Sequence, residues 1–266
     1  MRGRERTLEL DGRRLEASEW GEGEDCLLLL HEGLGAVSLW RDIPARLAEA
    51  TGLRVVAYSR FGYGRSDPVP LPRPLDYMRI EATEILPRVL EAAGIGRAIL
   101  VGHSDGATIA AIHGGSGADR RVRGLVLIAP HFFVEPVCIA EIARARRRFE
   151  EGDLRARLAR HHRDPDIAFR GWNDAWLDPG FPEVLELQPE VANIRIPVLA
   201  VQGLADPYGT VAQIELLERE AYAPVETLLL PGAGHAPHLE QPERVVAAIA
   251  DFAHRLFRVH EPRHAS

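Results

Sequence analysis

A serine between two glycines is the residue of this sequence best suited to nucleophilic chemistry. Ser104 stands in the motif G-H-S-D-G of residues 102–106, after the apolar run 99–101 and before a stretch of small residues. A strand that passes into a helix across such a turn lifts the serine hydroxyl out of the sheet, and the glycines leave room for the neighbouring strand and helix. The backbone amide of Asp105 can then donate to a developing oxyanion. The motif therefore predicts that Ser104 is a nucleophile.

Two later loops supply the partners that such a serine needs. A serine hydroxyl requires a base, and the base requires an acid that orients it. Asp206 follows the apolar run 197–203, and His235 lies in a glycine-rich loop after a further strand-like run. Either residue alone has a simpler explanation, as a helix cap or as a histidine held by backbone carbonyls. Because the order serine, acid, histidine is that of chains with this turn, we predict a catalytic triad of Ser104, Asp206 and His235.

A second glycine-rich loop, His-Glu-Gly-Leu-Gly at residues 31–35, follows the strand expected beside the nucleophile strand. Glycine lets backbone amides approach a ligand, so we predict an oxyanion hole formed by the amides of Gly33 and Asp105. Glu32 would bring a carboxylate close to a developing anion, and we expect that carboxylate to point away, although Glu32 remains a candidate for substrate contact. We expect His31 to be structural, because the base is already accounted for.

Strands and helices alternate along most of the chain, which predicts an α/β fold with a mostly parallel sheet and helices on both faces. Asp11-Gly12 predicts a tight hairpin turn near the N-terminus. Ser38 is the expected N-cap of the first helix. The expected strands cover 7–10, 13–20, 27–30, 54–59, 98–101, 122–129, 197–203 and 225–230, and the expected helices 38–50, 79–93, 210–221 and 242–257.

The alternation of strands and helices is interrupted in the middle of the chain. Residues 131–196 predict a helical insertion, or cap, which divides the core into residues 1–130 and 197–266. In open α/β folds ligands bind at the carboxyl edge of the sheet, so the insertion is expected to cover the site. Three of its aromatic residues are candidate substrate contacts: Phe132, Trp172 and Trp176.

Arginine is abundant in the first helical stretch of the insertion, which is expected over residues 137–163. We expect these arginines to form a solvated helix surface paired with Glu150, Glu151 and Asp153. The alternative is that one or two of them attract an anionic substrate. The arginines are Arg144, Arg146, Arg147, Arg148, Arg155, Arg157, Arg160 and Arg163.

Composition narrows the function classes. The net charge of −7 argues against a general nucleic-acid surface. Two cysteines support neither a disulfide framework nor a zinc cluster, and His161-His162 point to different faces of a helix, so we predict no metal site. The apolar runs are too short to cross a bilayer and residues 1–7 are charged, unlike a signal peptide, which predicts a cytoplasmic protein without membrane contact.

Together these motifs resemble the α/β-hydrolase superfamily over nearly the whole chain. Residues 31–35 are similar to its oxyanion loop, with Glu32 where glycine usually stands, and residues 59–67 match a structural loop after the next strand. The S-D-G turn and the tryptophans of the insertion resemble valacyclovir hydrolase-like esterases. Residues 234–242 resemble hydrolases that cleave a C–C bond in ring-cleavage products.

The resemblance implies an eight-stranded, mostly parallel sheet with a helical cap, and a serine hydrolase without metal or organic cofactor. Its substrate would be an ester, lactone or thioester of a small organic molecule, cleaved through an acyl-enzyme on Ser104. The alternatives are C–C bond hydrolysis and a non-catalytic small-molecule receptor. Serine at 104 departs from the aspartate of haloalkane dehalogenases and epoxide hydrolases, which excludes both chemistries. By the same resemblance the Asp105 side chain binds a substrate ammonium; the alternative is that it forms only local hydrogen bonds. The sequence does not determine the oligomeric state.

Overall fold

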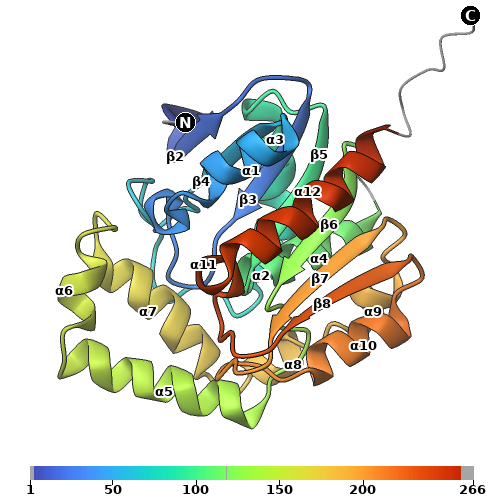
Figure 1. The fold of residues 1–266 in the computed structure, drawn as a ribbon. Helices are drawn as coiled ribbons and strands as arrows, with labels where there is room; N and C mark the ends of the chain where they lie inside the picture. Colours follow the sequence, from blue (N-terminus) through green and yellow to red (C-terminus); the bar gives the residue numbers. More distant parts are fainter. Residues whose placement is uncertain (1–2, 118, 259–266) are drawn as a thin grey trace, which may run out of the picture.

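One mixed sheet runs through the computed structural model, which describes residues 3–117 and 119–258, so that Met1 and Arg2 of the charged N-terminal run lie outside it. Within these residues eight strands have the order β1-β2-β4-β3-β5-β6-β7-β8 (Figure 1). The pairs β1–β2 and β2–β4 are antiparallel and the others parallel, as predicted. The strands are β1 (Arg4–Leu10), β2 (Arg13–Trp20), β3 (Asp25–Leu30), β4 (Arg54–Tyr58), β5 (Arg97–His103), β6 (Val122–Ile128), β7 (Val198–Gly203) and β8 (Val225–Leu230).

The N-terminal hairpin turns at the predicted dipeptide. Asp11 and Gly12 have φ angles of 49° and 75°, so both adopt the left-handed region that a two-residue hairpin turn requires. Leu10 pairs with Arg13 across the turn. The resulting ribbon adds two strands to the edge of the sheet next to β4.

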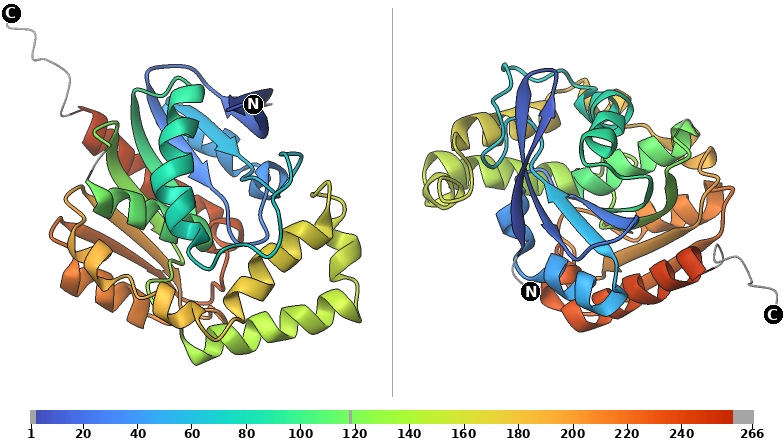
Figure 2. Two further views of the ribbon diagram at one scale, coloured as in Figure 1. Left: turned by 180° about the vertical axis from the view of Figure 1, so that it is seen from behind. Right: turned by 90° about the horizontal axis from the view of Figure 1, so that it is seen from above.

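Helices cover both faces of the sheet, and alternate strand residues point to the two faces. In β3, Leu27 and Leu29 pack into one core with α1 and α12, while Leu28 and Leu30 pack into the other with α3, α4 and α10. Figure 2 (right) shows α1 and α12 together on one side of the sheet. The core helices are α1 (Ile43–Thr51), α2 (Tyr77–Ile80), α3 (Leu86–Ala92), α4 (Asp105–Ser116), α10 (Ala212–Glu220), α11 (Pro237–Glu240) and α12 (Pro242–Arg258).

Between β6 and β7 the chain forms a run of helices, of which α5, α6 and α7 lie together beside one end of the sheet, while α9 lies next to α10 (Figure 1). Stacked rings of Phe149 and Phe169, with centroids 3.9 Å apart, join α5 to α7. Asn173 of α7 also donates to the Ile142 carbonyl of α5 at 3.0 Å. The helices are α5 (Pro136–Glu150), α6 (Leu154–Leu158), α7 (Pro165–Trp176), α8 (Phe181–Val184) and α9 (Gln188–Ala192). None of the described helices is both long and apolar enough to span a membrane.

Three predicted helices differ from the structure. Ser38 is not an N-cap, because the short 3₁₀ helix η1 (Val37–Trp40) precedes α1, which begins at Ile43 with a proline in its first turn, where the missing N–H is not needed. The expected helix 137–163 is divided into α5 and α6 around Gly152. The helix expected at 79–93 begins at Tyr77 and includes a π-helical turn, η2 (Glu81–Ile85).

Candidate active site

Ser104 occupies a sharp turn between β5 and α4. Its φ of 53° and ψ of −119° lie outside the conformations that a residue with a side chain prefers. Such strain persists only where the surroundings impose it, and it is common at functional sites. The close packing explains the flanking glycines: a Cβ on Gly106 would lie 2.0 Å from the Leu30 carbonyl oxygen of β3.

Three residues from distant parts of the chain meet at this turn. The Ser104 hydroxyl donates to His235 Nε2 over 3.0 Å. His235 Nδ1 donates in turn to the carboxylate of Asp206, at 2.8 Å from Oδ2 and 3.0 Å from Oδ1. The structure therefore brings together the three side chains that the sequence predicted, in the order nucleophile, base, acid.

Asp206 is fixed by its own loop after β7. Its carboxylate accepts hydrogen bonds from the Tyr208 amide at 2.8 Å and from the Gln202 side chain at 3.0 Å. Burial raises the pKa of Asp206, but the hydrogen bond and positive charge of His235 and the Tyr208 amide outweigh it, so the pKa lies below its usual value. An ionised Asp206 is therefore held where it orients the His235 ring.

A buried arginine holds the loop of residues 31–35. Arg60 donates to the carbonyl oxygens of His31 at 2.5 Å and Glu32 at 3.1 Å. The Gly35 amide bonds to the Glu32 carbonyl at 3.0 Å, which makes a tight turn with Gly33 at a central position. His31 is fully buried, with Nδ1 bonded to the Glu32 carbonyl and Nε2 accepting from the Arg60 amide, so its contacts are structural.

The two amides predicted for the oxyanion hole belong to elements close to Ser104. Gly33 lines the same pocket as Ser104. Asp105 is the first residue of α4, where a helix leaves its backbone N–H groups without intrahelical partners. The parallel pairing of β3 with β5 brings the two loops to the same edge of the sheet, as the sequence led us to expect.

The Glu32 carboxylate turns toward His103, the residue before the nucleophile. Its Oε2 lies 3.4 Å from His103 Nδ1, while His103 Nε2 donates to the His235 carbonyl at 2.7 Å. Burial raises the pKa of Glu32, but His103 outweighs it and holds the pKa well below its usual range. Glu32 therefore stays ionised. Through His103 it is linked to the loop that carries His235.

A pocket of about 100 Å³ lies over Ser104. It contains Ser104 and His235 together with five further residues predicted from the sequence, namely Glu32, Gly33, Asp105 and the two tryptophans of α7, Trp172 and Trp176. The remaining lining residues were not predicted, and they are Leu34, His131, Cys138, Ile142 and Tyr208.

Phe132 is not brought to this pocket. Its side chain is fully buried in the core, and its amide donates to Gln213 at 2.7 Å. The neighbouring residue, His131, faces the pocket instead. A signal for His131 was present, because it follows β6 at the carboxyl edge of the sheet, where ligands bind in such folds.

One oxygen of the Asp105 carboxylate, Oδ2, is engaged within the protein, while Oδ1 is buried without a hydrogen-bond partner among the described residues. Tyr77 donates its hydroxyl to Asp105 Oδ2 at 2.5 Å, and Arg60 Nη2 lies 3.9 Å from the same oxygen. Trp176 Nε1 donates to the Tyr77 hydroxyl at 3.2 Å, which links the pocket wall to this network. Burial raises the pKa of Asp105, despite the opposing charge of Arg60. These contacts support a local role for the carboxylate over recognition of a substrate ammonium.

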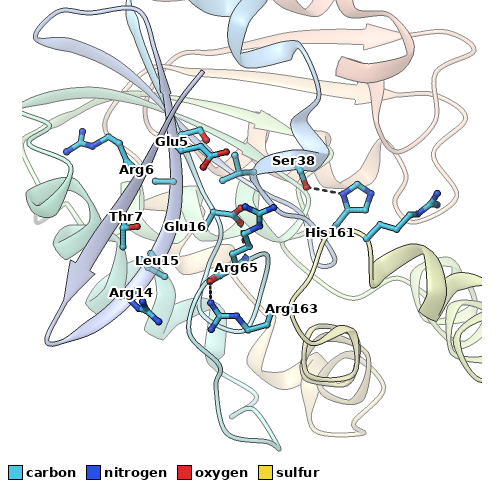
Figure 3. A pocket seen from close by; sticks show the side chains of 14 residues that line it. Glu5, Arg6, Thr7, Arg14, Leu15, Glu16, Ser38, Arg65, His161 and Arg163 are labelled. Atoms are coloured by element: carbon cyan, nitrogen blue, oxygen red, sulfur yellow. Dashed lines mark hydrogen bonds between the residues drawn. The ribbon is translucent and has the colours of Figure 1, made fainter. Parts of the chain in front are cut away.

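Two arginines of the insertion line a different and larger cleft. This cleft, of about 540 Å³, lies between the N-terminal hairpin and the segment from α6 to α7, and Arg14, Arg65, Arg160 and Arg163 line it (Figure 3). Arg163 donates to the Arg65 carbonyl at 2.9 Å, and His161 bonds to the Ser38 hydroxyl at 3.0 Å. Neither Arg160 nor Arg163 lines the pocket over Ser104. Arg144 and Arg155 are exposed, as predicted, but they pair with Glu141 and Asp166 and not with the predicted acids Glu150, Glu151 and Asp153.

Comparison with known proteins adds an independent line of evidence. The model of the alpha/beta hydrolase family matches residues 27–248. The chain is 27% identical to a pimeloyl-[acyl-carrier protein] methyl ester esterase of Yersinia enterocolitica, covering 88% of this chain and 95% of the relative. It is 24% identical to epoxide hydrolase 3 of Xenopus tropicalis, covering 88% and 72%. The structure of Est816, an N-acyl homoserine lactone degrading enzyme, shares the fold with a TM-score of 0.72 at 23% identity, covering 93% and 100%.

Proposed function

This chain belongs to the alpha/beta hydrolase family, and from that premise we propose that it is a serine hydrolase whose nucleophile is Ser104. One observation carries the proposal. A continuous line of hydrogen bonds joins Asp206, His235 and Ser104, with every link at 3.0 Å or less. This is the arrangement that acidifies a serine hydroxyl for attack on a carbonyl carbon.

The reaction proceeds through an acyl-enzyme. His235 takes the Ser104 proton as Oγ attacks the substrate carbonyl, and the Asp206 carboxylate stabilises the imidazolium that forms. The oxyanion accepts hydrogen bonds from the amides of Gly33 and Asp105. His235 then gives its proton to the leaving group, and water repeats the cycle on the acyl-Ser104 ester.

The proposed substrate is a small ester, lactone or thioester. The pocket of about 100 Å³ is smaller than a cavity of about 150 Å³ that holds benzene, which favours a short acyl group. Its apolar lining includes Ile142, Trp172 and Trp176. The similarity to a methyl ester esterase supports the same class. The similarity to an epoxide hydrolase does not extend the proposal to epoxides, because serine stands at 104, where that chemistry uses aspartate.

A fluorophosphonate probe tests the nucleophile directly. We expect it to label the native protein at Ser104, and to fail on the Ser104→Ala variant and on unfolded protein. The site of labelling is read by mass spectrometry of the modified peptide. A well-folded protein that the probe does not label would favour the alternative of a small-molecule receptor.

A substrate panel separates ester hydrolysis from C–C bond hydrolysis. The panel holds nitrophenyl esters of short acids, amino-acid esters, lactones and a dienoic ring-cleavage product, compared by kcat/KM. We expect the highest values with short esters or lactones. A higher kcat/KM with the ring-cleavage product would assign C–C bond cleavage instead.

A further inference from the structure

A second imidazole borders the pocket beside His235. His131 follows β6 and is 2% exposed, and its ring centroid lies 5.8 Å from that of His235 and 5.4 Å from that of Trp176. Its backbone is fixed to α4, because the Thr108 hydroxyl donates to its carbonyl at 2.8 Å and lies 3.2 Å from its amide. The ring is therefore held at the pocket by packing and by its backbone.

The ring nitrogens of His131 are not used by the protein. Among the described residues neither nitrogen has a hydrogen-bond partner, and Nδ1 is buried without one. The Nδ1–Cε1 edge faces Gly209, since a Cβ built there would lie 3.2 Å from Cε1 and 3.5 Å from Nδ1. This leaves the Nε2 edge to face the pocket that His131 lines. Nε2 therefore has no partner within the described residues and is available to a ligand in the pocket.

The protonation of the ring decides what that ligand is. Burial and the neighbouring His235 lower the pKa of His131 to about 3, so the ring is neutral at ordinary assay pH. A buried N–H without an acceptor is rarer than a bare acceptor, which places the proton on Nε2 rather than on Nδ1. His131 thus offers the pocket a neutral donor. The ionised Glu32 lines the same pocket and disfavours a second carboxylate there.

We propose that His131 is a specificity-determining residue, which donates from Nε2 to a neutral acceptor oxygen on the short part of the substrate that enters the pocket. That oxygen belongs to a hydroxyl or carbonyl group near the scissile bond. The assignment rests on the proposed serine hydrolase function, and it narrows the substrate class to short hydroxy- or oxo-acyl compounds.

Esters that share one leaving group test this assignment. The nitrophenyl esters of butyric, 2-hydroxybutyric, 3-hydroxybutyric and 3-oxobutyric acids differ only in the acyl oxygen. We expect at least one oxygenated ester to exceed the butyrate ester in kcat/KM by about tenfold or more, since a site built for a hydroxyl rejects the analogue that lacks it. This ratio should fall to about one in His131→Phe and persist in His131→Gln, whose amide keeps a donor close to the position of Nε2.

The variant His161→Phe is the matched control, because His161 lies in the larger cleft and not in the pocket over Ser104. It should keep the wild-type ratio. Equal kcat/KM for all four esters in the wild-type protein would overturn the assignment. A preference for an oxygenated ester that survives in His131→Phe would overturn it too. A histidine with a merely structural role would change kcat/KM for all four esters by the same factor and leave their ratio unchanged.

A binding measurement separates this assignment from the proposed function. Butan-2-one and 4-hydroxybutan-2-one cannot be hydrolysed, and they differ by one hydroxyl. Titration of ¹⁵N-histidine-labelled protein should move the Nε2 signal of His131, identified by its loss in His131→Phe, more with the hydroxyketone. If Ser104 resists the fluorophosphonate probe while this shift occurs, the hydrolase proposal fails and the His131 assignment stands. Absence of the shift in protein that the probe labels would refute the His131 assignment alone.

Discussion

The indole of Trp172 packs directly against the backbone of Gly33. A Cβ placed on Gly33 would lie 2.2 Å from Nε1 and 2.4 Å from Cδ1 of that ring. The contact joins α7 of the insertion to the loop that we propose as one half of the oxyanion hole. Any side chain at position 33 must therefore displace either the loop or the tryptophan.

Replacement of Gly33 by alanine should accordingly impair catalysis. We expect kcat for a short ester to fall by about 10²–10³, the usual cost of losing one oxyanion donor. The overpacking itself should cost about 1–3 kcal/mol of unfolding free energy. Both are measured in the Gly33→Ala variant, by steady-state kinetics and by urea unfolding.

The companion variant Trp172→Ala removes the clash. In the double variant Gly33→Ala/Trp172→Ala we expect part of the lost kcat to return, so that the two changes are not additive. Wild-type kcat in Gly33→Ala would contradict the expected displacement of the loop of residues 31–35.

His235 is predicted to contribute to turnover and little to stability. In His235→Ala we expect ester kcat/KM to fall by several orders of magnitude, because no other group is hydrogen-bonded to the Ser104 hydroxyl among the described residues. The melting temperature should barely move. His254→Ala is a suitable control, since that histidine bonds to the Thr51 carbonyl at 3.0 Å, outside the pocket. An active His235→Ala protein would exclude His235 as the base.

Local sequence rules were sufficient for the elements that carry Ser104, Asp206 and His235. The G-H-S-D-G motif and the Asp11-Gly12 turn have steric requirements that a few adjacent residues satisfy, so both could be recognised without a structure. The parallel sheet then places the ends of β5, β7 and β8 at one edge. The loops after β7 and β8 then bring Asp206 and His235 within hydrogen-bond distance of one another and of Ser104.

The lining of the pocket could not be predicted in the same way. Cys138 and Ile142 reach the pocket because α5 packs against α7, which also lines it, and Tyr208 reaches it from the loop after β7. Neither path has a local signature. Ser38 illustrates the same limit, because it suits an N-cap, yet it bonds to His161, which lies 123 residues further along the chain.

Arg60 is predicted to be essential for stability. Its side chain is buried, donates to the carbonyl groups of His31 and Glu32, and lies 3.9 Å from the buried carboxylate of Asp105. Arg60→Met leaves that carboxylate without its cation, which typically costs about 3–5 kcal/mol. We expect this loss in urea unfolding.

An arginine of the same loop provides the matched control for Arg60. Arg65 is exposed, and Arg65→Met should change the unfolding free energy by less than about 1 kcal/mol. If the two variants unfold at the same urea concentration, the Arg60 contacts do not stabilise the loop of residues 31–35.

Substrate length should be limited by the pocket of about 100 Å³. We expect kcat/KM for nitrophenyl esters to be highest with two to about four acyl carbons and to fall steeply by eight, because longer chains exceed this volume. Ile142→Ala removes part of the pocket wall and should shift the optimum toward longer chains. An octanoate ester hydrolysed as well as the acetate by the wild-type protein would contradict a limit on acyl length set by this pocket.

The pH dependence of stability should reflect the buried ring of His131. Its pKa is lowered from the usual 6.5 to about 3 in the folded protein, so between these values the unfolded chain binds one more proton. The contribution of His131 to the free energy of unfolding is therefore fully present above pH 6.5 and is lost as the pH falls toward 3. Between pH 7.5 and 5 the loss is about 2 kcal/mol, since each pH unit below 6.5 costs about 1.4 kcal/mol.

The variant His131→Phe isolates this contribution. His31 and His238 are also buried with lowered pKa values, but they are common to both proteins and cancel in the comparison. The wild-type protein should lose about 2 kcal/mol more unfolding free energy than His131→Phe between pH 7.5 and 5, measured in urea. Equal losses of unfolding free energy in the two proteins would mean that the His131 ring is protonated as readily in the folded chain as in the unfolded one. His131 would then not be the neutral donor that we propose at the pocket.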